Sequence, residues 1–138
     1  MKKKQNKINY IYPVAFFLFI CWIIYMANAN ISNIFFELIN IIPGGDKLGH
    51  FFLFGILAML VNLALNCRTF KFNKYSIQLG GFIVFTLTMF EELSQYLFPN
   101  RTVDIVDLIA NLAGIVFFSY LSTRIAKTYA VKSKNPSK

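Results

Sequence analysis

Four long apolar segments constrain the fold of this chain more than any other feature of its sequence. They span residues 10–29, 48–65, 76–98 and 103–122, and short polar or Pro/Gly-containing stretches separate them. The hydrocarbon core of a bilayer is about 30 Å thick, and a helix needs about 20 apolar residues to cross it. Backbone polar groups in lipid must be satisfied within the segment, so helices are expected rather than strands. The sequence therefore predicts an all-α membrane protein with a four-helix transmembrane bundle.

The composition supports this class and excludes two others. Hydrophobic residues make up 57% of the chain and charged residues 14%, whereas soluble domains have about 45–50% and about 25%. The two cysteines, Cys21 and Cys67, lie within or at the end of apolar segments and are interpreted as small buried hydrophobes. A soluble domain and a disulfide scaffold are therefore excluded.

The basic residues predict the orientation of the bundle. Of the 14 lysines and arginines, all but Lys47 and Arg101 precede the first segment, lie between the second and third, or follow the fourth. By the positive-inside rule, both termini are expected in the cytoplasm, as a basic N-terminus (1–9) and a basic tail (123–138) around one transmembrane domain (10–122). Topology and contact with anionic headgroups in the lipid bilayer account for the net charge of +8. No basic groove with interleaved aromatic residues lies outside the segments, so nucleic acid is not an expected partner.

Two further segments affect the predicted topology. The sequence around residues 27–29 imitates a signal-peptide cleavage site, but the preceding apolar run is longer than the usual 7–15 residues or so. We therefore expect a retained first helix. In the first outer connection, 30–45, apolar residues recur at helical spacing and predict a short helix. Such a helix would lie in the outer interface and cover what is beneath it, or would be an apolar tether packed on its neighbours.

Ten charged or strongly polar residues are not explained by the distribution of basic charge, and the predicted topology locates all of them on the outer side. They are Asp46, Lys47, His50, Glu91, Glu92, Gln95, Arg101, Asp104, Asp107 and Asn111. On the fourth helix, the last three and Gly114 fall within an arc of about 80°. Because lipid cannot solvate such stripes, they are expected to face the interior of the bundle.

Several of these residues also have a purely structural interpretation. Asp46 and Asp104 could cap helices, and a lone His50 could be a packing residue. Gly114 could be a point of close helix packing. Glu92 resists this account, because about 9 Å of helix separates it from the end of its segment. A charge well inside a span costs about 2.5–3.5 kcal/mol on insertion scales, so we favour a functional cluster.

The spacing of these residues resembles that of a known family. The patterns are Asp46-Lys47-x-x-His50-x-x-x-Phe54, Glu92-x-x-Gln95 and Arg101-x-x-Asp104-x-x-Asp107-x-x-x-Asn111-x-x-Gly114. Their ordered set, over about residues 43–121, resembles the VanZ-like family of small bacterial membrane proteins. The resemblance implies a cell-envelope protein of the bacterial cytoplasmic (inner) membrane and lowered susceptibility to lipoglycopeptides such as teicoplanin. It implies no particular reaction.

The cluster could serve an enzyme or a binder of a lipid-linked envelope molecule. Lys47, Arg101 and His50 could hold a phosphate, and Glu92 could act as a general acid or base. Asp104 and Asp107, with His50 or Glu92, could take a divalent cation. The catalytic candidates are thus Glu92, His50 and Asp107. The ligand-binding candidates are Asp46, Lys47, Glu91, Gln95, Arg101, Asp104 and Asn111.

The alternative hypothesis is a non-catalytic membrane module. The same residues could form an ion-pair network that fixes the packing of three helices. The protein would then act by binding a drug, lipid or partner protein. The chain has no HExxH motif, nucleophile elbow or P-loop, so the sequence does not decide whether it is an enzyme.

Overall fold

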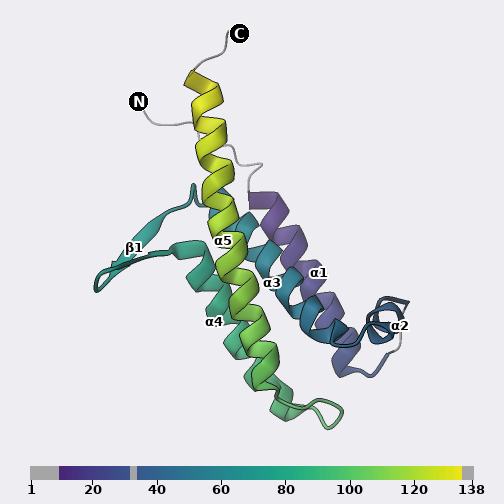
Figure 1. Ribbon diagram of the computed structural model, residues 1–138. Coiled ribbons are helices and arrows are strands. Elements are labelled where there is room, and N and C mark those ends of the chain that lie inside the picture. Colours follow the sequence, from purple (N-terminus) through teal and green to yellow (C-terminus); the bar gives the residue numbers. More distant parts are fainter. Residues whose placement is uncertain (1–9, 32–33, 135–138) are drawn as a thin grey trace.

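The structure is a computed structural model that describes residues 10–31 and 34–134. The four longer helices among the described residues, α1, α3, α4 and α5, run in alternating directions along the molecule (Figure 1). A short helix follows the first of them, and a β-hairpin joins the second to the third. The bounds are α1 (Ile11–Asn28), α2 (Ile34–Ile41), α3 (Gly45–Ala64), β1 (Thr69–Phe72), β2 (Tyr75–Gln78), α4 (Leu79–Ser94), the 3-10 helix η2 (Gln95–Leu97) and α5 (Ile105–Lys134).

Three of the helices have the length and hydropathy of membrane spans. They are α1, α3 and the part of α5 from Ile105 to Tyr129. The fourth, α4, has 16 residues and is about 24 Å long. It is shorter than the predicted segment 76–98 because that segment begins in β2 and also includes η2. Within the described residues, three of the four predicted segments thus form helices long and apolar enough to cross a membrane, whereas a transmembrane bundle of four helices stays a prediction.

The ends of the chain were predicted to lie on one side. Helix α1 begins and helix α5 ends at the same end of the bundle (Figure 1), while a cytoplasmic location stays a prediction. Residues 1–9 and 135–138 lie outside the described residues. Helix α5 continues to Lys134, so the predicted tail at 123–138 begins as part of this helix.

The β-hairpin corrects the all-α prediction. Strands β1 and β2 pair antiparallel, with Phe70 opposite Ile77 and Phe72 opposite Tyr75. The two-residue turn begins at Asn73, whose φ of 54° is in the left-handed region, and asparagine is favoured in such hairpin turns. The sequence pattern was missed because each strand has only four residues, with a basic residue inside β1.

The centre of the bundle is a close crossing of α3 and α5. A Cβ atom added to Gly114 would lie 2.1 Å from the backbone oxygen of Phe51, and one added to Gly55 would lie 2.4 Å from the Phe118 ring. Small residues allow helix backbones in membranes to approach this closely. The interpretation of Gly114 as a packing point is therefore confirmed. The buried apolar core lies next to this crossing and comprises Ile20, Phe54, Leu57, Ala58, Val84 and Ile115.

Candidate functional site

The ten predicted polar residues meet at one end of the bundle, where α4 ends and α3 and α5 begin. Five of the six acidic residues of the chain are among them. Hydrogen bonds and ion pairs join eight of them into one network, and His50, which contacts Asn111, adds these two through its 3.6 Å approach to Asp107. The structure thus brings together every residue that the sequence singled out, whereas their roles in catalysis or binding stay predictions.

Lys47 lies at the centre of the first part of this network. Its Nζ is 2.6 Å from Asp46 Oδ2, 2.8 Å from Asp104 Oδ2 and 2.7 Å from Asp107 Oδ1. A lysine ammonium has three N–H donors, so each carboxylate receives one of them. Asp107 is buried, at 8% exposure, and Lys47 therefore compensates a carboxylate that water hardly reaches.

Asp104 has a second role at the start of α5. Its Oδ1 accepts a hydrogen bond from the backbone N–H of Val106 at 2.8 Å, and its backbone oxygen accepts from Asp107 and Leu108. This is N-terminal capping, as one interpretation of the sequence predicted. The Lys47 ammonium and the Val106 N–H both hold the pKa of Asp104 below its usual range. The same interpretation of Asp46 is wrong, because α3 is preceded by Gly44 as its N-cap.

A divalent-cation site at Asp104 and Asp107, which the sequence left open, does not match this geometry. Among the described residues, no group of three or more His, Cys, Asp or Glu side chains is arranged to hold a metal ion. The reason is the position of Lys47, whose ammonium lies where a cation between Asp104 and Asp107 would have to sit. The residues therefore fit an internal ion pair and not a resident metal.

His50 connects α3 to the deeper part of α5. Its Nδ1 is 3.2 Å from Asn111 Oδ1, and its Nε2 is 3.6 Å from Asp107 Oδ2. Asn111 is fully buried, and within the described residues its Nδ2 has no hydrogen-bond partner. The imidazole is thus oriented by an amide on one side and a carboxylate on the other.

The second part of the network lies at the end of α4. Glu92 is 4% exposed, and its Oε1 accepts from the Asp104 backbone N–H at 2.8 Å. Gln95 Nε2 donates to Glu91 Oε1 at 3.0 Å and lies 3.4 Å from Glu92 Oε2. Both oxygens of Glu92 are therefore engaged. The guanidinium of Arg101 lies 3.6 Å from Glu91 Oε1.

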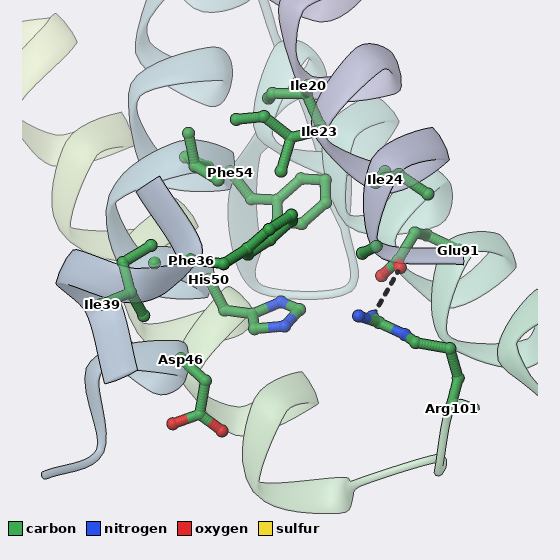
Figure 2. A pocket seen from close by; sticks show the side chains of 13 residues that line it. Ile20, Ile23, Ile24, Phe36, Ile39, Asp46, His50, Phe54, Glu91 and Arg101 are labelled. Atoms are coloured by element: carbon green, nitrogen blue, oxygen red, sulfur yellow. Dashed lines mark ion pairs between the residues drawn. The ribbon is translucent and has the colours of Figure 1, made fainter. Parts of the chain in front are cut away.

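A pocket of about 230 Å³ opens beside this network. Its polar end contains His50, Arg101, Glu91 and Asp46, and Figure 2 shows the His50 ring and the Arg101 guanidinium turned toward the same space. The apolar remainder comes mainly from α1 and α3, and α2 contributes Phe36 and Ile39. The other lining residues are Ile20, Ile23, Ile24, Ala27, Gly49, Leu53 and Phe54.

Two predictions bear on this pocket. The short helix predicted within 30–45 is confirmed as α2, with residues 32–33 outside the described residues, and it forms part of the pocket wall. Glu92 and Asp107, two of the three catalytic candidates, are not among the lining residues. Of the three, His50 alone lines the pocket.

The comparison with protein families bears on the whole chain. The model of the VanZ/LLP1 family matches residues 2–126. The chain belongs to the VanZ/LLP1 family. The match includes α1, so it is wider than the pattern of residues 43–121 on which the resemblance was based. No curated protein and no solved structure matches the chain. The family and the three long apolar helices together make it a membrane protein resembling VanZ.

This VanZ/LLP1 family member also has a neutral polar cluster that the sequence interpretation missed. It lies at the opposite end of the bundle, beside the hairpin. Asn62 Nδ2 donates to Ser119 Oγ at 2.9 Å, and Asn62 Oδ1 accepts from the Gly81 N–H at 3.2 Å. Gln78 bonds to Ser122 and Thr123. The spacing of Ser119, Ser122 and Thr123 on one helical face was the available signal. The cluster ties α3, α4 and α5 together.

Proposed function

We propose that this VanZ/LLP1 family member is a bacterial cell-envelope protein that binds a phosphate-bearing amphiphile, such as a lipid-linked envelope molecule. Its site would open at the outer leaflet of the cytoplasmic membrane, with both termini inside. The observation that carries the proposal is the pocket itself, which combines an arginine and a histidine at one end with an apolar wall along α1 and α3.

Arg101 is the best candidate for the phosphate contact. Its guanidinium has five N–H donors, and within the described residues it has one ionic contact, the 3.6 Å approach to Glu91, and no hydrogen bond. Arginine binds phosphate through two parallel N–H groups. Lys47, which the sequence suggested for the same role, has all three donors directed at carboxylates, so we assign it to the structural network.

The headgroup should also carry a hydrogen-bond donor. Oε2 of Glu91 is buried and has no partner among the described residues, and an unsatisfied buried acceptor costs about 1–3 kcal/mol. A hydroxyl or ammonium group beside the phosphate would satisfy it. A sugar phosphate or a glycerol phosphate on a lipid carries both groups.

The size of the pocket limits how much of the ligand it can hold. Pockets for drug-sized molecules have about 300–1,000 Å³, whereas this one has about 230 Å³. It can therefore enclose a headgroup and the first part of a chain, and the rest of the chain would lie in the surrounding lipid. The proposed activity is binding without catalysis, because Glu92 already uses both oxygens for contacts within the protein.

Thermal stability of the purified protein in detergent tests the proposal. A polyprenyl phosphate should raise the unfolding temperature, because a ligand that binds only the folded state stabilises it. The uncharged polyprenol should have no effect. Arg101→Gln should abolish the shift, whereas the matched variant Arg124→Gln, which changes an exposed arginine on α5, should retain it. An equal shift with the polyprenol, or in Arg101→Gln, would contradict phosphate recognition.

The consequence for antibiotics needs a separate measurement. We propose that occupancy of this pocket lowers susceptibility to teicoplanin, by sequestering or presenting an envelope molecule. Expression in a susceptible bacterium should raise the inhibitory concentration of teicoplanin, and Arg101→Gln should lose that effect at equal protein level. If the wild type has no effect while the phosphate-dependent shift is present, the binding proposal stands and the resistance proposal fails.

A further inference from the structure

The β-hairpin has two chemically different faces. Side chains alternate along a strand, and residues directly opposite each other in a pair share a face. The pairs Phe70–Ile77 and Phe72–Tyr75 therefore lie on one face. The other face has the pairs Thr69–Gln78 and Lys71–Ser76. One face is thus entirely apolar and aromatic, and the other is polar.

The apolar face is exposed and continues the lateral surface of the bundle. Phe72 is 67% exposed and Tyr75 62% exposed. Phe70 packs edge-on against Phe82 of α4, with 5.4 Å between ring centroids, and Phe82 is itself 49% exposed. In Figure 1 the hairpin extends sideways from the end of α3 and the start of α4, away from the helices. The aromatic face therefore extends a surface that faces lipid in a membrane protein.

Positive charge surrounds this face, because Lys71 lies on the polar side of the same hairpin, Lys74 in its turn and Arg68 just before β1. Arg68, Lys71 and Lys74 are exposed on or beside the hairpin, and Lys74 Nζ lies 5.3 Å from the centre of the Tyr75 ring. No acidic residue occurs between residues 48 and 90, so nothing nearby in the sequence neutralises these groups. Aromatic rings at the level of the headgroups, together with Lys and Arg beside them, are the pattern of a segment that binds an anionic membrane surface.

We propose that the hairpin is an interfacial anchor that binds the anionic lipid headgroups around the bundle. Its aromatic face enters the boundary between headgroups and acyl chains, and Arg68, Lys71 and Lys74 bind the headgroups. This accounts for a hairpin that extends away from the bundle, since an isolated pair of short strands is only marginally stable in water. The anchor would also hold the junction of α3 and α4 at a constant depth. It is independent of the pocket at the other end.

Depth-dependent fluorescence quenching tests the proposal on the full-length protein in vesicles. The single tryptophan, Trp22, is first removed by the substitution Trp22→Phe. In this background, Phe72→Trp places a fluorescent probe on the apolar face. Ser76→Trp is the matched control on the polar face of the same hairpin. In phosphatidylcholine vesicles that contain phosphatidylglycerol, bromine-labelled acyl chains should quench Phe72→Trp several-fold more than Ser76→Trp. Aqueous iodide should show the opposite order.

The charge contribution is measured with the same probe. Removing phosphatidylglycerol, or adding Lys71→Gln and Lys74→Gln, should reduce the quenching of Phe72→Trp by brominated chains, and high salt should do the same. Three outcomes would overturn the proposal. Iodide could quench both probes equally, which would show that both faces of the hairpin are in water. Both quenchers could leave Phe72→Trp unaffected, which means cover by a second copy or another protein. Quenching could also be independent of anionic lipid, which excludes headgroup binding.

Discussion

The carboxylate of Glu92 accepts a hydrogen bond from the backbone N–H of Asp104, with 2.8 Å between Oε1 and N. This contact joins the end of α4 to the start of α5 across the connection of residues 95–104. Asp104 in turn holds Lys47 of α3 at 2.8 Å. The buried glutamate therefore positions the aspartate that binds the lysine, and three helices are connected through two adjacent contacts.

Removal of the Glu92 carboxylate should destabilise the fold. Glu92→Ala leaves the Asp104 N–H without its acceptor, and we expect a loss of about 1–3 kcal/mol in the free energy of unfolding. Glu92→Gln keeps an oxygen for this contact and should lose less. Chemical denaturation in detergent measures both. Glu37→Ala, an exposed acidic position on α2, serves as control, and equal stability of Glu92→Ala and the control would contradict the positioning role.

Lys47 should be more important for folding than for ligand binding. Lys47→Met leaves three carboxylates without their shared cation, one of them buried. The Lys47 side chain is 30% exposed. We therefore expect the free energy of unfolding to fall by roughly 2–3 kcal/mol, between the values for exposed and buried ion pairs. Adding Asp107→Asn should recover part of it, as a double-mutant cycle would measure. Additive losses would mean that the two side chains do not interact.

The stability of the protein should depend on pH through Asp104. Its pKa is lowered, first by the hydrogen bond from Lys47 and then by the one from the Val106 N–H. A group with a lowered folded-state pKa stabilises the fold above its unfolded pKa, which is about 3.9 for aspartate. The unfolding temperature should therefore be level near neutral pH and fall as the pH drops below about 4. Asp104→Asn keeps a capping side chain and should reduce this fall. An unchanged acid dependence in the variant would show that another group causes it.

The convergence of the site was predictable from the sequence, but its pairing was not. Polar residues inside apolar segments must face the bundle interior, and alternating helix directions bring His50, Glu92 and Asp107 to one end. The carboxylates that Lys47 contacts on α5 and just before it depend on the rotation and translation of α3 against α5. The periodicity of the sequence does not determine these. A phosphate role for Lys47 and a metal at Asp104 and Asp107 were therefore equally compatible with the spacing.

Other features of the structure could not be predicted because the sequence pattern does not distinguish them from alternatives. The apolar residues of the pocket, such as Ile24 and Leu53, cannot be distinguished by type from residues that face lipid, because both environments favour the same side chains. The hairpin was missed because the period-two alternation from Phe70 to Ile77 is too short to separate from a polar connection. The end of α4 was predicted too late because η2 continues the apolar run without the geometry of an α-helix.

The crossing of α3 and α5 gives the final prediction, because it sets the distances within the site. A methyl group at Gly114 would meet the Phe51 backbone oxygen at 2.1 Å, and neither helix backbone can move away without separating Lys47 from Asp107 and His50 from Asn111. We expect Gly114→Ala to destabilise the protein by about 1–3 kcal/mol, the usual cost of overpacking. Gly49→Ala is the matched control on α3.

At Gly49 the nearest atom to an added Cβ, Ile39 Cδ1, is 4.0 Å away. Replacing a glycine inside a helix by alanine without a clash should leave the fold equally stable or stabilise it by about 0.5–1 kcal/mol. Thermal unfolding of the two variants beside the wild type distinguishes them. If Gly114→Ala unfolds at the temperature of Gly49→Ala, the helices do not cross as closely as this, and the contacts of Lys47 and His50 with α5 would have to be longer as well.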